Sequence, residues 1–323
     1  MNTRLMSMLV GVAGMSLGCA SAPGAGDSEV LGSQAQGDTA PYVSLVEYDG
    51  SAYQFAWSDI QTKLNQEFDG VCGDTFCEGD YSNLTPLRVS CSVASADGIV
   101  EDCVWSFAGS RQAVDPHTAA ITVDAPTFQC HFHPVGTTAA DLVSLLSGST
   151  DAIHATLPGT TGSIYDALGD CFQHPIGATP ITYDTTPPLT YVEVADYYVS
   201  LTWKAKWANA KAALKSGFDG VCGDTFCESD YSDLQSLAFV CSITKSTGNV
   251  KGCSWVFGGS YAVVQASGVD QATTASFNCH IGMHGTLAQL INTLTAAGTT
   301  DPIFRPLPGT TLSAYDQLVG CLP

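Results

Sequence analysis

The sequence contains an acidic, cysteine-bearing stretch that it repeats without a change. FDGVCGDTFCE occupies Phe68–Glu78 and recurs as Phe218–Glu228, 150 positions later. Its carboxylates could gather around a hard cation such as calcium, which prefers oxygen ligands, although their spacing differs from that of an EF-hand. Alternatively, the carboxylates accept hydrogen bonds from turn amides and from a helix start in a loop that disulfides anchor, or they contact a partner. The candidate binding loop, with the acid that follows each copy, comprises Asp69, Asp74, Glu78, Asp80, Asp219, Asp224, Glu228 and Asp230.

Histidines beside cysteines form a second pattern that could do chemistry. CHFH begins at Cys130 in residues 41–172 (the first half), and CHIGMH begins at Cys279 in residues 191–323 (the second half). Thiolate, imidazole and thioether groups all bind transition metals. Cysteine pairing argues against the two cysteines as ligands, because using them would leave an odd number in each half. A metal site would then use histidine alone, with His131 and His280 as candidates. The alternative is that each is a histidine at a strand end whose ring forms hydrogen bonds within the fold.

Motifs for nucleophilic catalysis are missing from the sequence. It contains no G-x-S-x-G and no H-E-x-x-H, and no S-x-x-K falls in both halves. The polar residues that the halves share gather instead at turns, helix caps and the cysteine loop. The sequence therefore identifies no catalytic residue and favours a protein that is not an enzyme.

The 13 cysteines divide into one near the N-terminus, Cys19, and six in each half. An even set in each half of an exported chain predicts three disulfides per half and an oxidising compartment. If Gly98 takes the left-handed position of a hairpin turn, Cys91 lies opposite Cys103, and we predict that these two are bonded. The twelve paired cysteines are Cys72, Cys77, Cys91, Cys103, Cys130, Cys171, Cys222, Cys227, Cys241, Cys253, Cys279 and Cys321.

A helix must precede the repeated loop in each half. Ser51–Gln54 has the form of a capping box, and an apolar stripe of helical period follows it. Gly70 and Gly220 are predicted to close the two helices. The stripe consists of Trp57, Ile60, Leu64 and Phe68, repeated as Trp207, Ala210, Leu214 and Phe218.

Strands and two further helices are expected to complete each half. Alternation of apolar and polar residues indicates strands around a turn at Asp97-Gly98, matched by Thr247-Gly248. The order predicts an α+β fold, with helices packed on a small antiparallel sheet, in two tandem copies. In the first half the predicted strands are 42–48, 87–93, 103–107 and 120–132, and the helices lie near 138–146 and from Thr160 or Thr161.

The N-terminal residues have the pattern of an export signal. Arg4 precedes the apolar run Leu5–Leu17, which suits a signal h-region and is too short to span a bilayer comfortably. With the Ser16-Leu17-Gly18-Cys19 that follows, the stretch resembles a bacterial lipoprotein leader, although Ser16 stands where such leaders usually carry Leu. The resemblance implies cleavage after Gly18 and acylation of Cys19, for example with palmitate. Cleavage after Ala22 is the alternative.

The domain organisation follows from these segments. Residues 1–18 form the signal peptide and 19–40 a lipidated flexible tether, because this stretch has no apolar period. Disulfide-rich repeats occupy 41–172 and 191–323, joined by a stiff Pro/Thr-rich linker over 173–190.

The net charge of −20 makes nucleic acid an improbable partner. It is unevenly spread: the segment 41–188 has 18 acids and three bases, a net of −15, and 189–323 has 10 acids and seven bases, a net of −3. We expect a cell-surface or bacterial outer-membrane lipoprotein, anchored to the membrane only by its acyl chains, that binds an extracellular protein or glycan. The alternative is a secreted metal-binding protein or metal-dependent enzyme that uses the acidic loop, with calcium, or the Cys-His cluster.

Overall fold

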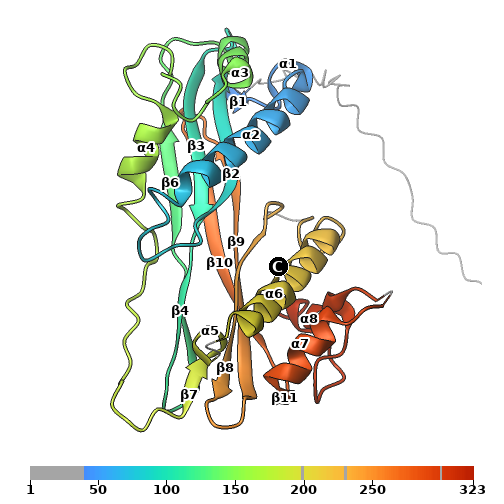
Figure 1. The fold of residues 1–323 in the computed structure, drawn as a ribbon. Coiled ribbons are helices and arrows are strands. Elements are labelled where there is room, and N and C mark those ends of the chain that lie inside the picture. Colours follow the sequence, from blue (N-terminus) through green and yellow to red (C-terminus); the bar gives the residue numbers. More distant parts are fainter. Residues whose placement is uncertain (1–39, 198–199, 229–230, 299) are drawn as a thin grey trace, which may run out of the picture. The chain divides into compact units, whose positions relative to one another are not determined.

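In the computed structural model, helices cover antiparallel sheets, so the fold is α+β as predicted. The structure describes residues 40–197, 200–228, 231–298 and 300–323. The predicted signal peptide, Cys19 and nearly all of the tether lie outside the described residues. Figure 1 shows the arrangement of the elements.

The first half contains a four-stranded antiparallel sheet in the order β1-β2-β3-β6. Helix α2 covers one face of it, and Phe68 from this helix packs on Trp105 and Phe107 of β3, with ring centroids 5.9 and 4.9 Å away. The predicted apolar stripe is therefore the core face of the helix. The strands are β1 (Tyr42–Ser44), β2 (Thr85–Ala94), β3 (Val100–Ala108) and β6 (Thr127–Phe132), and the helices are α1 (Tyr48–Ser51), α2 (Gln54–Cys72), α3 (Ala139–Gly148) and α4 (Ile164–Cys171).

The second half contains the sheet β10-β9-β8-β7, also antiparallel, with β11 paired to β9. Helix α6 covers it as α2 covers the first sheet, and Phe218 packs on Trp255 and Phe257. The strands are β7 (Tyr191–Glu193), β8 (Gln235–Thr244), β9 (Asn249–Val264), β10 (Asp270–Ile281) and β11 (Gly285–Thr286), and the helices are α5 (Val194–Tyr197), α6 (Leu201–Cys222), α7 (Leu287–Thr295), the 3-10 helix η1 (Pro302–Phe304) and α8 (Ala314–Leu318).

Each half extends a hairpin beyond its own sheet. In the first half the hairpin consists of β4 (Arg111–Val114) and β5 (Ile121–Asp124), which pair with each other. In the second half β9 and β10 stay paired as far as Val264 and Asp270. We call these the first hairpin, 111–124, and the second hairpin, 259–271.

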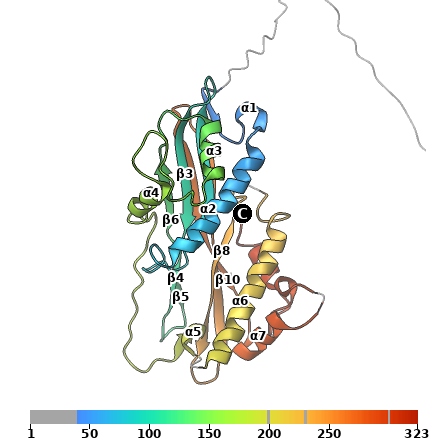
Figure 2. The same ribbon diagram turned by 45° about the horizontal axis from the view of Figure 1, so that its top comes forward.

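The uncovered faces of the two sheets lie against each other. Ser106 and Ser260 share a hydrogen bond of 2.7 Å, as do Thr127 and Thr274. A Cβ atom at Gly258 would lie 2.3 Å from the Cβ of Ala108, so only glycine fits there. Figures 1 and 2 both show β9 and β10 running beside β2 and β3. Each sheet thus has an apolar face under its helices and a more polar face toward the other half.

All twelve predicted cysteines form disulfides, and every bond joins residues of the same half. The predicted Cys91–Cys103 bond is confirmed: the two residues are direct neighbours in the register of β2 and β3. This density of disulfides is compatible with an extracellular protein. None of the helices in the described part of the chain has the length and hydropathy needed to cross a membrane. The other bonds are Cys72–Cys77, Cys130–Cys171, Cys222–Cys227, Cys241–Cys253 and Cys279–Cys321.

Two predicted helix ends are wrong. Helix α2 continues through Gly70 to Cys72, and α6 through Gly220 to Cys222, because the buried cysteine adds one more apolar position to each helix. The capping box at Ser51 does not form either. Ser51 ends α1 with a φ of 67°, and the cap residue of α2, Tyr53, makes no side-chain bond.

The last helix of the first half begins later than predicted. It starts at Ile164 rather than at Thr160 or Thr161, because Ser163 and Asp166 form the capping box. The turn before it needs Gly159, which has a φ of 69°.

Two predicted strands are also corrected. The strand 42–48 is only three residues long, and 120–132 is divided into β5 and β6 at Ala125-Pro126. Proline has no backbone N–H to donate to a ladder, which explains the break. Strand β4 was not predicted.

The predicted linker over 173–190 contains no helix or named strand, and backbone hydrogen bonds fasten it at both ends. Near its start, Ile176 exchanges backbone hydrogen bonds with Thr127 of β6, at 2.9 and 3.1 Å. At its end, Thr190 donates to the carbonyl of Pro116 in the first hairpin over 2.9 Å.

Candidate metal centre

Strand alternation places three metal-ligating side chains on the uncovered face of the first sheet. Cys103 of β3 lies opposite Phe132 of β6, and both point into the core. Their neighbours Asp102, His131 and His133 therefore point to the other side. We call these three residues the candidate metal centre.

The three side chains meet at one point. One carboxylate oxygen of Asp102 lies 3.1 Å from Nε2 of His133, and the other lies 3.1 Å from Nδ1 of His131. One ligand atom from each residue falls within 4.8 Å of the other two. Ligands bound tetrahedrally at the usual Zn–N and Zn–O lengths are about 3.3 Å apart, so only small movements separate this geometry from a bound state.

The burial of the three residues differs in a way that suits an accessible site. Asp102 is 3% exposed, whereas the side chain of His133 is 62% exposed. Two imidazoles and one carboxylate are a ligand set for zinc and similar divalent transition metals, and three protein ligands leave at least one coordination position open. Here that position would face the side of His133, toward solvent.

Hydrogen bonds from both halves orient Asp102. Its backbone N–H donates to Ser92 Oγ over 3.2 Å, and its carboxylate accepts from the backbone N–H of Asp270 over 3.0 Å. Asp270 begins β10, directly after the turn at the tip of the second hairpin. The centre is therefore completed by a segment from the other half.

The Asp270 side chain is a buried carboxylate beside the centre. It is 0% exposed, and neither of its carboxylate oxygens has a hydrogen-bond partner. Burial raises its pKa to about 6; the nearby Ser90 hydroxyl lowers the pKa, the Asp102 carboxylate raises it, and His131 lowers it. A buried carboxylate without a partner is unfavourable. Its field favours a cation at the neighbouring centre.

The same surroundings act on His131. The hydrogen bond to Asp102 raises the pKa of His131, burial lowers it, and the charges of Asp102 and Asp270 raise it further. Every acidic neighbour of this imidazole thus favours positive charge at the site.

Sequence reasoning found part of this centre. His131 was a candidate, and His133 belonged to the pattern that drew attention to it. Asp102 was missed, although its place beside a core cysteine puts it on the same sheet face as His131. Asp270 could not be found from local sequence, because only the packing of the two halves brings it here.

The second candidate histidine, His280, lies at the matching place in the second half without an equivalent carboxylate. The position that corresponds to Asp102 is Gly252, where a Cβ atom would lie 2.9 Å from Cε1 of His280. Within the described residues, the group of potential ligands that converges is the one in the first half. Cys130 and Cys279 are in disulfides, as pairing in each half required.

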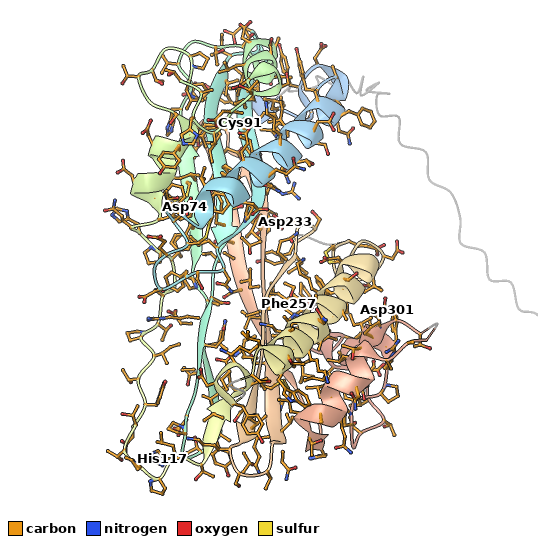
Figure 3. The ribbon with its side chains drawn as sticks, viewed as in Figure 1. Asp74, Cys91, His117, Asp233, Phe257 and Asp301 are labelled. Carbon is orange, nitrogen blue, oxygen red and sulfur yellow. A yellow bond between two sulfur atoms is a disulfide. The ribbon has the colours of Figure 1, made fainter. Side chains whose placement is uncertain are left out.

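The acids of the repeated loop are spread out rather than gathered. Asp74 lies in the loop after α2 (Figure 3), and every described acid of the set is exposed. Asp80 lies 3.2 Å from Arg111, and Asp219 lies 2.9 Å from Lys215. Asp230 is outside the described residues. Calcium binding by this loop stays a prediction.

Comparison with known proteins gives no relative. No family model matches the chain, and no match is found among curated proteins or solved structures. The function must therefore be argued from the site itself.

Proposed function

We propose that this chain is an exported metal-binding protein that holds one divalent transition metal ion, of the zinc class, at Asp102, His131 and His133. The convergence of three ligand atoms within 4.8 Å carries the proposal. The buried carboxylate of Asp270 supports it, because this charge lies beside the centre and no hydrogen bond of ordinary geometry reaches its oxygens.

The arrangement suits reversible binding. Asp102 is fixed by Ser92 and Asp270, so it is a preorganised ligand. His131 and His133 lie at the surface and can turn toward an incoming ion. An ion bound here would be exposed enough for another ligand to complete its shell, which fits uptake, storage or delivery of metal outside the cell.

Titration of the full chain with Zn²⁺, by calorimetry or against a chromophoric chelator, tests the proposal. We expect one ion per chain in the wild type and a loss of affinity of about tenfold or more in Asp102→Asn, His131→Gln and His133→Gln. His154→Gln is the matched control. His154 does not belong to the centre, and its Nδ1 pairs instead with the carboxylate of Asp151 over 2.9 Å. Equal affinity in all five proteins would refute the site.

The location is part of the proposal. Twelve cysteines in disulfides support an oxidising compartment, and the leader resemblance supports acylation of Cys19 in a bacterial lipoprotein. The shared 11-residue loop and the matching order of elements support two tandem copies of one domain. Cys19→Ser should move the protein from the membrane fraction to the soluble fraction and abolish incorporation of labelled palmitate. Retention of the variant in membranes would contradict lipid anchoring.

A second candidate function is the binding of a cationic extracellular protein or glycan by the first half. The observation that favours it is charge: −15 over 41–188 against −3 over 189–323. Charge of this kind sets partner choice and encounter rate. The repeated loop offers a matched pair of variants for the test. Neutralising Asp69, Asp74 and Glu78 should reduce salt-sensitive capture of a surface partner more than neutralising Asp219, Asp224 and Glu228, and equal effects would count against the idea.

A further inference from the structure

The first hairpin and the second sheet line a cavity of about 520 Å³ that is open to solvent. One wall is the turn of the hairpin, residues 118–121. The other consists of Tyr191, Lys251, Gly252, Ser254, Asn278 and His280. The cavity lies at the place in the second half that corresponds to the candidate metal centre in the first.

Three differences between the halves account for the cavity and its polarity. Along β3 and β9, Glu101 corresponds to Lys251, Asp102 to Gly252 and Val104 to Ser254. The second half therefore has a base in place of an acid, no side chain in place of the candidate metal ligand Asp102, and a hydroxyl in place of a buried apolar side chain. The corresponding surfaces therefore have opposite character on a shared framework.

The hairpins also approach their partner sheets differently. In the first half, the hydroxyl of Ser92 donates to the carbonyl of Gly268 in the second hairpin, which closes the space beside Asp102. The corresponding hydroxyl in the second half belongs to Ser242, which lies directly opposite Gly252 in the strand register. It is 0% exposed and has no hydrogen-bond partner. The first hairpin thus leaves open the space that the second hairpin fills.

The lining of the cavity provides donors and a cation but no carboxylate. The ammonium of Lys251, which lines the cavity, lies 5.7 Å from the ring centroid of Tyr191. Ser254 Oγ donates to Oδ1 of Asn278, which leaves the amide nitrogen of Asn278 as a donor. With the imidazole of His280, these groups can surround a small negative charge.

We propose that the cavity binds a small organic or inorganic anion that bears a carboxylate or a phosphate group. The volume lies within the range of about 300–1,000 Å³ that is usual for small-molecule pockets. Lys251 supplies the countercharge, and His280 and Asn278 donate hydrogen bonds. This site is separate from the candidate metal centre and does not depend on it.

Titration of the full chain with acetate and with inorganic phosphate, the smallest probes of each class, tests the inference by NMR shifts or calorimetry at low ionic strength. We expect saturable binding of at least one probe to the wild type. Lys251→Gln should weaken it by about tenfold or more, because a charge-assisted hydrogen bond is lost. Gly252→Asp should abolish it, because it restores a carboxylate beside His280. Lys206→Gln, on the far side of the sheet on α6, is the control and should bind as the wild type does.

Two further measurements keep the test decisive. Near-ultraviolet circular dichroism shows whether the Gly252→Asp variant retains its fold. If that variant does not fold, Lys251→Gln still tests the site. His131→Gln should bind the anion normally, so a failure of the metal proposal leaves this one standing. Absence of saturable binding of both probes, or equal binding by the wild type and Lys251→Gln, would overturn the inference.

Discussion

The backbone N–H of Asp270 donates a hydrogen bond of 3.0 Å to the carboxylate of Asp102. These residues belong to different halves and are 168 positions apart. Because the same contact brings the buried Asp270 side chain to the candidate metal centre, we expect metal affinity and the packing of the halves to be coupled. A variant that separates the halves should therefore lose the site even with all three ligands intact.

Asp270→Asn should change stability and metal affinity in opposite directions. Removing a buried charge whose burial outweighs its favourable contacts should stabilise the metal-free protein by about 1–3 kcal/mol. It should also weaken Zn²⁺ binding, because an attractive charge is lost. Urea unfolding with EDTA and with excess Zn²⁺ measures both effects, and Asp151→Asn, at an exposed position, is the control. A variant that is less stable without metal and binds it equally well would contradict this role for Asp270.

The elements that position the centre could largely be predicted from the sequence. Period-two alternation placed Trp105 and Phe107 in the core, and it implies that the residues between them face the other way. The 3.6-residue period placed Phe68 on the core side of α2. These signals are local, because each residue's neighbours along the chain decide which face it occupies.

The contacts between the halves could not be predicted in this way. No local pattern indicates that Ser106 reaches Ser260 or that Asp270 reaches Asp102, because these contacts depend on the packing of two complete sheets. A weak signal existed at Gly258: glycine inside a strand marks a close approach, here to Ala108. The predicted helix ends at Gly70 and Gly220 were wrong for another reason. In each helix, burial of the following cysteine outweighed the tendency of glycine to end a helix.

Disulfides that close long loops should contribute more stability than those that close short ones. Cys130 and Cys171 are 41 residues apart, and Cys72 and Cys77 only five. The loop-entropy relation gives about 4 kcal/mol for the first bond and about 2 kcal/mol for the second. Paired Cys→Ser variants of each bond, compared by urea unfolding, should show this order. The reverse order would mean that the chain entropy of the unfolded state does not control these contributions.

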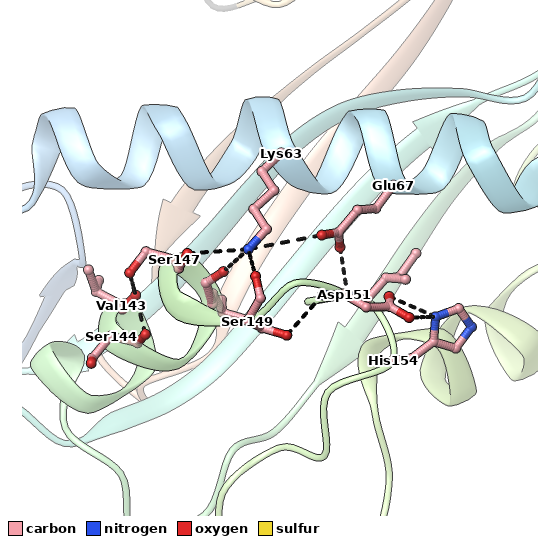
Figure 4. A network of polar contacts seen from close by, with 10 residues as sticks. Lys63, Glu67, Val143, Ser144, Ser147, Ser149, Asp151 and His154 are labelled. Carbon is pink, nitrogen blue, oxygen red and sulfur yellow. Dashed lines mark hydrogen bonds and ion pairs between the residues drawn. The ribbon is translucent and has the colours of Figure 1, made fainter.

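Lys63 should stabilise the first half by closing the end of helix α3. Figure 4 shows its ammonium at the C-terminal end of the helix: it donates to the carbonyls of Leu146 over 2.8 Å and Ser147 over 3.3 Å in the last turn, and to that of Ser149 just beyond. A cation at a helix C-terminus pairs with unsatisfied carbonyls and with the helix dipole. Because the side chain is 26% exposed, Lys63→Met should cost only about 1–2 kcal/mol.

The second half provides an internal comparison for Lys63. Arg305 donates to the carbonyls of Thr293 and Ala296 at the end of α7, over 2.9 and 2.8 Å. Arg305→Met should therefore have a similar effect to Lys63→Met, whereas Lys245→Met, at an exposed turn, should change the free energy of unfolding by less than about 0.5 kcal/mol. Thermal or urea unfolding distinguishes these outcomes, and equal effects at all three positions would show that capping is not the cause.

Asp233 should make stability fall as pH rises through the acid range. This carboxylate lies near the contact between the halves (Figure 3) and accepts 2.6 Å bonds from the backbone N–H and the hydroxyl of Ser260. Burial raises the pKa of Asp233 above its ordinary value of 3.8, against the bonds from Ser260 and the charge of Arg88, which lower it. A raised pKa in the folded state means that folding favours the protonated form. The stabilisation is therefore complete below the unfolded pKa and is lost as pH rises through the folded pKa.

Asp233→Asn isolates this effect, because the first half already carries the amide version. At the corresponding position, Asn83 accepts from the backbone N–H of Ser110 over 2.8 Å, so the fold tolerates asparagine there. The free energy of unfolding of the wild type, measured against that of the variant in urea at a series of pH values, should decline from pH about 4 upward and then level off. A difference that stays constant, or that grows with pH, would show that the pKa of Asp233 is not raised in the folded protein and that its pairing with Arg88, at 3.8 Å, outweighs burial.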